Sequence, residues 1–463
     1  MKGLLHRVLL CAAGFAALPV PAADVLDTGF AEQGVKTLDF EGMPGTVGVE
    51  FGIANCPAAN GRQLVVMRDH FSGVLVTRLN FDGSIDTSFG AGGMLRHALQ
   101  TDASPVVNTA AVCRADGGIW IAARAWISDS DRRIRLIALD AQGQLATGGA
   151  FGTTGYFDIP LESHAGGLQP DRNIRGFNQT ADGRAFVTGW VASGSGNRSF
   201  LIALDAEGAL QGVSVFQPPG LTLSIEAVAA GVGPGGGIWV AGFGTGTGNL
   251  RNAYRAYLDP GTLQLVHSEL FGIPGEHVEV AGGAMVRNGV MVVGATRRPT
   301  VTTPARPLLL VMREGGIISA LDLPQPQQLA GGIDTGINAE GGTIVPMPGG
   351  RVLYAIGAEA WNGTTFEGYK GWYFAQAVIG ASVADDRVDA AFGEGGRAVA
   401  SIASGDASCI GLLNRQKHAR AGVWEGRPTV IGFWSRQCEP EGRQDAVLLR
   451  LKPGDRVFGH GFE

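Results

Sequence analysis

Short apolar runs recur along this chain, and each is bounded by Gly, Asp or Asn. The runs hold about five or six residues rich in Val, Ile and Leu, as in 62–67, 118–123 and 290–295, which favours strands. After residue 23, no amphipathic segment reaches the length of an ordinary helix. Gly contributes 73 of the 463 residues, which suits many tight turns. The pattern predicts an all-β chain.

A phrase recurs between the predicted strands: a turn with Asp and Gly, an apolar residue, and then Phe-Gly-x-x-Gly. The clearest copy spans 78–93, and others lie at 26–34 and 385–396. The Phe of the phrase, or its substitute, returns after about 50 to 70 residues, and each interval contains the same succession of four short strands. These markers are Phe30, Phe89, Phe151, Phe216, Phe271, Leu321, Phe392 and Phe458.

Four strands per interval and seven intervals predict one domain over 24–463, a seven-bladed β-propeller. The N-terminus begins with a lone phrase and one strand, 35–40, whereas the last repeat stops where its fourth strand should begin. The N- and C-terminal strands are therefore expected to close one shared blade, which leaves no exposed sheet edge. The predicted blades span about 45–100, 101–160, 161–222, 223–276, 277–325, 326–402 and 403–463.

The phrase itself has a mechanical interpretation. Asp82 and Gly83 suit a tight hairpin turn, and Phe89 is expected to be buried between blades, which contributes about 1.5–3 kcal/mol. We predict no resident cofactor. The alternative is Ca²⁺ bound by the acidic residues of the phrase, although the dense Asp-x-Asp-x-Asp-Gly pattern is missing. The acidic residues concerned are Asp82, Asp86, Asp385, Asp386 and Asp389.

Residues 1–23 have the organisation of a signal peptide. The positively charged residues Lys2 and Arg7 precede the apolar run 8–18, and a cleavage region rich in small residues follows at 20–23. The apolar run is too short for a helix to cross a bilayer of roughly 30 Å, and no later segment is apolar enough. We expect export to the periplasm or the extracellular space. A net charge of −6 without a Lys/Arg run argues against nucleic acid as a partner.

Four cysteines follow the predicted signal peptide: Cys56, Cys113, Cys409 and Cys438. An even number in an exported chain permits two disulfides, with three possible connectivities. Cys409 and Cys438 lie in neighbouring predicted strands of the last repeat and are the best candidate pair. Cys56 and Cys113 hold equivalent places in consecutive repeats. Their pairing requires Cα atoms within about 4.4–6.8 Å, which the sequence does not decide.

The phrase at 78–93 resembles the delta-60 repeat, a β-propeller repeat of bacterial exported proteins. The resemblance covers nearly the whole chain after residue 23 and is good at 26–34, 139–155 and 385–396. The match to the repeat is weaker at 204–220, 258–275 and 311–324. The resemblance implies a propeller and an exported location. It implies no shared set of catalytic residues.

Catalytic motifs are missing from the sequence: there is no Gly-x-Ser-x-Gly, no His-Glu-x-x-His and no Walker-type loop. The glycine runs 233–237 and 242–248 are not followed by helices, so they are interpreted as turns and not as phosphate loops. Propeller enzymes of the hydrolase, lyase or quinoprotein type draw residues from several blades. An enzyme with its site in the central channel therefore stays the alternative.

The longest irregular connections are predicted to gather on one face of the ring, where the second-to-third and fourth-to-first connections meet. Trp126 and Trp361 are candidates for stacking on a sugar or an apolar ligand, and His164 with His277 is the alternative for a metal. The candidate ligand-binding residues are Trp126, Asp129, Asp131, His164, Arg172, Arg297, Arg298, Glu359, Trp361 and Tyr369.

The sequence thus favours a non-catalytic binding or scaffold propeller, acting as a monomer without a membrane span. Its predicted partner is an envelope glycan or protein, and the sequence does not choose between the two. A propeller enzyme is one alternative. A surface adhesive protein, whose partner is another cell, is a further alternative.

Overall fold

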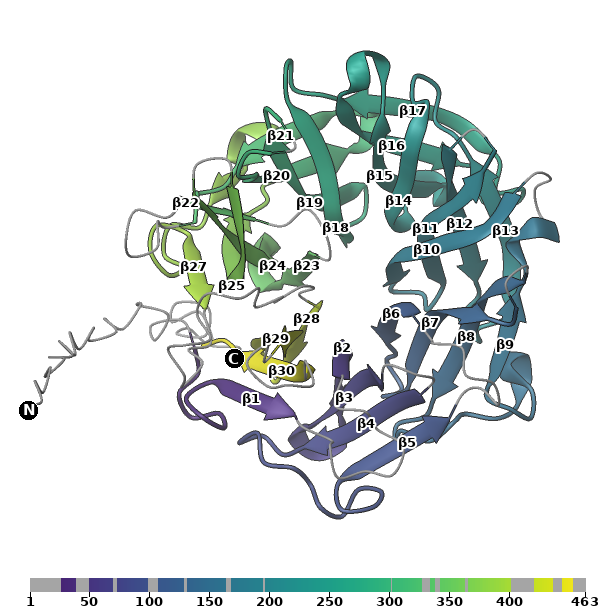
Figure 1. Cartoon of the computed structure of the whole chain (residues 1–463), viewed down its shortest axis with the longest axis vertical. Helices are drawn as coiled ribbons and strands as arrows, with labels where there is room; N and C mark the ends of the chain where they lie inside the picture. The colour runs from purple at the N-terminus through teal and green to yellow at the C-terminus, as the bar shows by residue number, and fades with distance from the viewer. Residues whose placement is uncertain are drawn as a thin grey trace, which may run out of the picture.

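The computed structural model describes residues 26–38, 50–69, 73–98, 107–128, 131–163, 168–194, 196–300, 302–326, 334–337, 342–362, 365–400, 420–435 and 444–452. These residues form seven antiparallel sheets around one axis, which confirms the seven-bladed β-propeller (Figure 1). No helix in the described part of the chain is long and apolar enough to cross a membrane.

Each blade is a sheet whose first strand is innermost. Blade 1 contains β2 (Glu50–Ala58), β3 (Arg62–Asp69), β4 (Gly73–Leu79) and β5 (Met94–Ala98). Blade 2 contains β6 (Val107–Cys113), β7 (Ile119–Trp126), β8 (Arg132–Leu139) and β9 (Tyr156–Ile159). Blade 3 contains β10 (Leu168–Gln179), β11 (Ala185–Ser193), β12 (Gly196–Leu204) and β13 (Leu210–Phe216). Blade 4 contains β14 (Leu223–Val232), β15 (Ile238–Thr245), β16 (Arg251–Leu258) and β17 (Leu265–Phe271).

The last three blades follow the same order with two variations. Blade 5 contains β18 (His277–Arg287), β19 (Val290–Arg298), β20 (Arg306–Arg313) and β21 (Ile318–Asp322). Blade 6 has a divided inner strand, β22 (Asp334–Ile337) and β23 (Thr343–Met347), then β24 (Arg351–Asn362), β25 (Thr365–Val378), β26 (Arg387–Val388) and β27 (Arg397–Ala400). Blade 7 contains β28 (Arg420–Trp424), β29 (Arg427–Ser435), β30 (Gln444–Arg450) and β1 (Val35–Leu38). Short 3₁₀ turns lie at Ala59–Gly61, Gly149–Phe151, Leu161–Ser163, Pro234–Gly236, Thr247–Asn249, Glu314–Gly316, Pro348–Gly350 and Val383–Asp385.

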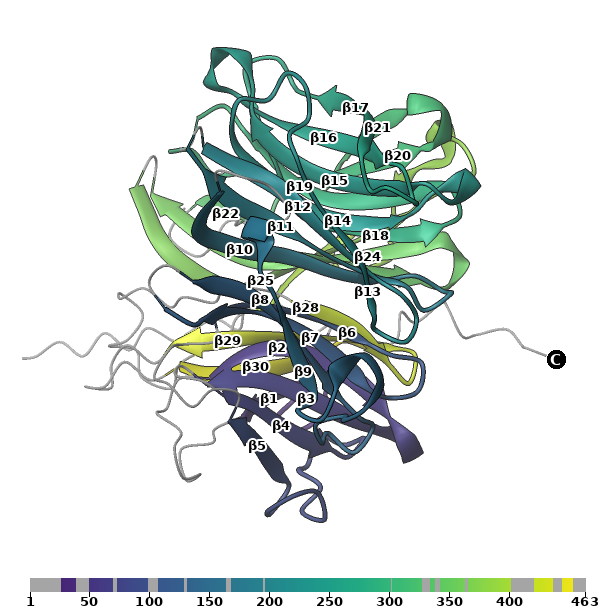
Figure 2. The same ribbon diagram turned by 90° about the vertical axis from the view of Figure 1, so that its right-hand side faces the viewer.

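The two ends of the chain close blade 7 as predicted. The N-terminal β1 is the outermost strand and pairs antiparallel with β30, with Val35 opposite Leu449 and Leu38 opposite Ala446. In the side view, β1, β30 and β29 follow one another in this order (Figure 2). The predicted strand 35–40 thus begins at the expected residue. Backbone pairing across the join gives the ring a continuous sheet at the point where the chain starts and stops.

The hydrophobic core is divided among the blade interfaces. Each pair of consecutive blades shares one cluster of buried side chains, for example Trp120 with Phe200 between blades 2 and 3. At the join, Phe30 from the N-terminal phrase packs with Leu75 of blade 1 and Ile431 of blade 7. Because alternate side chains of every strand point to opposite faces of a sheet, each blade contributes to the clusters on both of its sides.

The repeated phrase forms one local structure in its three best copies. The amide of the Phe donates to the carbonyl of the Asp three residues earlier, and a Gly four residues after the Phe donates to the Phe carbonyl. The Asp–Phe–Gly sets are Asp27–Phe30–Gly34, Asp86–Phe89–Gly93 and Asp389–Phe392–Gly396. Gly93 has φ +99, and a Cβ there would lie 2.2 Å from Cγ2 of Ile85, so the bend requires glycine. Phe30 and Phe89 are buried, as predicted for Phe89.

A bulge interrupts the innermost strand in blades 1, 3, 4 and 5. It leaves Ile53, Arg175, Val228 and Ala281 without a partner in the adjacent strand. In blade 6 the inner strand is divided at the corresponding place, between Ile337 and Thr343. A bulge bends a strand and increases its twist. The inner strands therefore bend at the same level around the axis.

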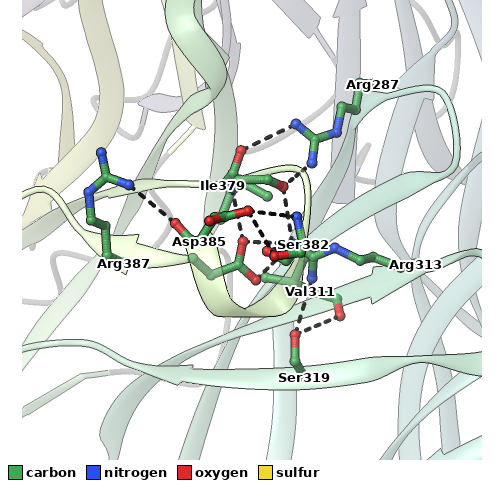
Figure 3. A network of polar contacts seen from close by, with 10 residues as sticks. Arg287, Val311, Arg313, Ser319, Ile379, Ser382, Asp385 and Arg387 are labelled. Carbon is green, nitrogen blue, oxygen red and sulfur yellow. Dashed lines mark hydrogen bonds and ion pairs between the residues drawn. The ribbon is translucent and has the colours of Figure 1, made fainter.

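Polar contacts on one face join blades 5 and 6. Nη2 of Arg313 lies 2.6 and 2.8 Å from the two carboxylate oxygens of Asp386. Arg287 donates to the backbone carbonyls of Ile379 and Gly380, and Figure 3 shows both guanidinium groups directed at the 379–386 segment. The pair is buried, since the side chains of Arg313 and Asp386 are 9% and 5% exposed. This buried pair links one blade to the next independently of the apolar core.

A disulfide joins Cys56 of β2 to Cys113 of β6, with Cα atoms 5.3 Å apart. It connects the innermost strands of blades 1 and 2, so the equivalent places of these cysteines in consecutive repeats do bring them together. The pair favoured from the sequence, Cys409 and Cys438, lies outside the described residues. That second disulfide stays a prediction.

Candidate functional site

Two faces of the ring differ in their connections. The first-to-second turns and third-to-fourth connections share one face, which we call the turn face and which includes 59–61 and 80–93 of blade 1. The second-to-third and fourth-to-first connections share the opposite face, which we call the loop face and which includes Ile127, Asp131 and 302–305. Antiparallel order dictates this division.

An open groove of about 680 Å³ lies on the turn face where blade 7 meets blade 1. Its volume falls in the range of about 300–1,000 Å³ that is typical of ligand sites. Blade 1 contributes the β2–β3 turn and the start of the β4–β5 connection, and blade 7 contributes the β28–β29 turn. We call it the closure groove, and its lining residues are Asn60, Gly61, Arg62, Asn80, Phe81, Glu425 and Arg427.

Phe81 supplies an exposed aromatic surface to the closure groove, with 42% of the residue accessible to solvent. It lies in the turn closed by the bond from Gly83 N to the carbonyl of Asn80, 2.9 Å long. The Arg450 guanidinium lies 4.3 Å from the Phe81 ring centroid, and the Trp424 ring meets it edge-on at 5.6 Å. The ring is therefore held by buried neighbours while part of its surface stays open.

Glu425 and Asn60 are the free polar side chains of the closure groove. Each is exposed, and neither has a hydrogen-bond or ionic partner among the described residues. Glu425 adopts φ +48, a left-handed conformation that Gly235 and Gly349 hold in the corresponding turns of blades 4 and 6. A Cβ built on Gly61 would lie 3.9 Å from Oε1 of Glu425, so the carboxylate lies beside the blade 1 turn. Glu425 and Gly426 form the two-residue turn between Trp424 and Arg427, and a turn of this kind requires positive φ at both residues.

Each of the two arginines of the closure groove contacts a carboxylate that it shares with a second arginine. Nη1 of Arg62 lies 3.2 Å from Oδ2 of Asp86, and Nη1 of Arg427 contacts Oδ2 of Asp27. The Ser88 hydroxyl and the Arg78 guanidinium lower the pKa of Asp86 to about 2. Burial by itself would raise the pKa of Asp27, but Arg450 and Arg427 hold it below its usual value. Glu425 is thus the charged lining residue that has no ionic partner among the described residues.

The central axis holds a smaller cavity of about 170 Å³, lined by the innermost segments of all seven blades. Asn178 spans three of these segments: its Nδ2 donates to the carbonyl of Gly283, and its Oδ1 accepts from Ala230 N. Among the described lining residues, Arg175 is the ionisable side chain, and its Nε lies 2.6 Å from Oε2 of Glu226. The described wall therefore combines apolar side chains such as Ile53, Phe177 and Ile344 with amides, backbone and one ion pair.

The predicted loop-face residues form separate contacts within the described chain. Arg297 contacts Glu276 and Asp322, and Arg298 contacts Glu279, which also accepts from Arg251. Asp131 pairs with Arg133.

Two further loop-face candidates lie inside a strand. Glu359 and Trp361 belong to the long strand β24, each is 6% exposed, and Nε1 of Trp361 donates to Oε2 of Glu359 at 3.0 Å. Expected as loop residues, they lie inside the blade 6 sheet, because β24 pairs with β22 on one side and with β25 on the other at these positions. Burial leaves the Trp361 ring little surface on which a ligand could stack.

Other predicted residues are placed only in part. Trp126, Arg172 and Tyr369 lie in β7, β10 and β25, respectively, and their side chains are outside the described set. Asp129 and His164 fall outside the described residues. Among the residues that the structure does describe, no group of three or more His, Cys, Asp or Glu is arranged to hold a metal ion.

Sequence reasoning missed the closure groove, although one signal was present. The Asp/Gly turn carries a small residue in blades 2 and 3, Ala141 and Ala206, where blade 1 carries Phe81. An aromatic residue in place of the small residue of this turn indicates a role that is specific to blade 1. Asn60 belongs to the same blade as Phe81, whereas Glu425 comes from the last blade, and ring closure brings it to Phe81.

Comparison with protein-family models and with curated proteins gives no match. Among solved structures, polysaccharide lyase Uly1 is 13% identical, with a TM-score of 0.43, covering 90% of this chain and 94% of that one. A protein of unknown function from Dyadobacter fermentans is 11% identical, with a TM-score of 0.42 and coverages of 90% and 99%. The NanB sialidase from Streptococcus pneumoniae is 10% identical, with a TM-score of 0.42 and coverages of 90% and 70%. No residue role is carried from these proteins to this chain.

Proposed function

We propose that this chain is an exported, non-catalytic binding propeller that recognises a neutral saccharide in the closure groove. The observation that carries the proposal is the meeting of an exposed aromatic ring, a free carboxylate and a free amide in one open groove: Phe81, Glu425 and Asn60. An aromatic face packs against the C–H side of a sugar ring, while carboxylate and amide groups bond its hydroxyls.

The charge pattern favours a neutral ligand over an acidic one. Arg62 shares Asp86 with Arg78, and Arg427 shares Asp27 with Arg450, so each guanidinium group of the groove is already bound to a carboxylate before a ligand arrives. The remaining charge, on Glu425, would repel a uronic or sialic acid at close range. Hydroxyl groups, in contrast, donate to this carboxylate and accept from the outer N–H groups of both guanidinium groups.

The number of free carboxylates supports binding without turnover. Most glycoside hydrolases place two carboxyl groups on either side of the scissile bond, one to donate a proton and one as base or nucleophile. In the described closure groove Glu425 is a free carboxylate, whereas Asp86 and Asp27 are engaged by arginines. A hydrolase site in the central channel stays the alternative, and the axial cavity would be its location.

Export is part of the proposal. The Cys56–Cys113 disulfide supports an oxidising compartment, which agrees with the signal peptide predicted at 1–23. The resemblance to the delta-60 repeat also implies an exported location. Peptide mapping of the secreted protein tests this directly, since cleavage after Ala22 or Ala23 is expected.

A glycan array of neutral and acidic saccharides, followed by titration calorimetry, tests the binding function. Phe81→Leu keeps an apolar side chain against Trp424 but removes the aromatic surface, and Glu425→Gln removes the charge while keeping its shape. Each change is expected to weaken binding about tenfold, which corresponds to roughly 1.4 kcal/mol. Both variants should melt within a few degrees of the wild type.

A matched control lies on the same face, remote from the closure groove. Ile317, 49% exposed, follows a turn of blade 5, and Ile317→Ala should leave the affinity unchanged. Equal affinity of the wild type and Phe81→Leu for every bound saccharide would remove the closure groove as the site. Cleavage of the bound saccharide would replace the binding function with an enzymatic one.

A further inference from the structure

The closure groove rests on a second layer of residues that line no part of it. Asp27 is 7% exposed and belongs to the N-terminal phrase, far from the groove in sequence. Its Oδ2 accepts from Nε of Arg450 at 2.7 Å and from Arg427, which does line the groove. One carboxylate therefore fixes a groove residue and a buried guanidinium at once.

Arg450 carries this contact to the aromatic part of the groove. Its side chain is 1% exposed and lies over the rings of Phe30 and Phe81, 4.4 and 4.3 Å from their centroids. Nη1 of Arg450 also donates to the backbone carbonyl of Phe81. The backbone and the ring of Phe81 are thus held by a residue from blade 7.

The N-terminal phrase also contacts the Phe81 turn directly. The amide of Ala31 donates to the carbonyl of Asp82 at 2.7 Å. A Cβ at Gly83 would lie 2.6 Å from the Phe30 ring, so this turn and the phrase are in close packing. The conformation of the turn that presents Phe81 therefore depends on residues 27–31.

From these contacts, and resting on the proposed saccharide site, we infer that Asp27 is a positioning residue of the closure groove. The groove reaches its binding geometry only when the N-terminal phrase is docked on Arg450 and Arg427. A chain whose N-terminal phrase is undocked would keep its other blade interfaces but present Phe81 and Arg427 in an unfixed arrangement. Ligand and phrase then stabilise each other, because binding to the docked state alone shifts the equilibrium toward it.

The test compares two buried aspartates of the same kind in the full-length protein. Asp27→Asn removes the charge that holds Arg450, and Asp386→Asn removes the charge that holds Arg313 at the corresponding end of β20. Both variants should lower the melting temperature by similar amounts. Only Asp27→Asn should weaken saccharide binding, about tenfold, and accelerate amide exchange in 79–83. Asp27→Glu, which keeps the charge, should restore most of the affinity even if Asp27→Asn folds poorly.

Equal effects of Asp27→Asn and Asp386→Asn on affinity and on exchange in 79–83 would overturn the inference. Unchanged exchange in 79–83 for Asp27→Asn would overturn it as well. The exchange measurement needs no ligand, so it tests the positioning role of Asp27 separately from the saccharide-binding function. If the wild type binds no saccharide, the proposed function fails, while the exchange comparison still decides whether Asp27 positions the groove.

Discussion

Gly176 of β10 lies directly against the backbone carbonyl of Val228 in β14, so that a Cβ at position 176 would be 2.0 Å from this oxygen. These residues belong to the innermost strands of blades 3 and 4, and each is next to or within a bulge. The close approach leaves room for hydrogen only. It sets how tightly the inner strands gather around the axis.

Gly176→Ala should therefore destabilise the ring. The added methyl group must push one inner strand outward, and overpacking of this kind costs about 1–3 kcal/mol. Gly194→Ala is the control, because a Cβ there meets nothing within 4 Å. Thermal melting followed by circular dichroism compares the two. Equal melting temperatures for both variants would show that the inner strands of blades 3 and 4 can move apart without a loss of stability.

Removal of the Cys56–Cys113 disulfide should also lower stability. The bond closes a loop with a sequence separation of 57 residues, and the chain-entropy relation gives about 4 kcal/mol for such a loop. The double variant Cys56→Ala/Cys113→Ala should melt well below the wild type under oxidising conditions. Addition of a reductant should lower the melting temperature of the wild type. In the double variant this bond is already absent, so the reductant should not lower the melting temperature through it. A reductant effect of equal size in both would assign the stabilisation to another pair of cysteines.

Deletion of the N-terminal residues should destabilise the protein far more than their number suggests. A chain that begins near Gly45 lacks β1 and the Asp27 phrase, and it exposes the edge of β30 and the apolar cluster around Phe30. We expect a large drop in melting temperature and a tendency to associate, both measurable by scanning calorimetry and light scattering. Melting identical to that of the full-length protein would contradict ring closure by β1.

Stability should fall at acid pH through the aspartates of the phrase. Asp86 has a pKa lowered to about 2 by Ser88 and Arg78, and the pKa of Asp27 is lowered as well, whereas an unfolded Asp titrates near 3.8. A folded-state pKa below the unfolded value gives stability that is complete above about pH 4 and is lost as the pH falls toward 2. Melting curves from pH 7 to 2 should show this loss. The Asp86→Asn variant should have a lower melting temperature at pH 7 than the wild type, and its melting temperature should fall less between pH 4 and 2. If the melting temperatures of both proteins fell equally over this range, Asp86 would not be the group responsible.

Local pattern was enough to predict the architecture. The Asp-x-x-Phe turn and the Gly four residues later are bonded within one short segment, so Phe30, Phe89 and Phe392 could be aligned without a structure. The spacing of the strands also repeats, because each repeat is a short unit that packs mainly against the neighbouring repeats. The closing strand followed from counting, since the last repeat lacks one strand and the first residues supply one. Glu359 and Trp361 were misjudged in exposure because they were expected in a loop, although Asn362-Gly363 after them is a hairpin-turn signal that places both residues in a strand.

The sequence by itself determined the all-β class, the seven blades and the closure of the ring, because these depend on short-range periodicity. Tertiary structure decided the rest. It paired Cys56 with Cys113, buried Arg450 among Phe30, Phe81 and Trp424, and brought Asn60, Phe81 and Glu425 into one groove. Arg450, Trp424 and Glu425 of the last blade are separated from Phe30, Asn60 and Phe81 by most of the chain, and no local preference encodes their approach. The closure of the ring between the last blade and the first brings them together.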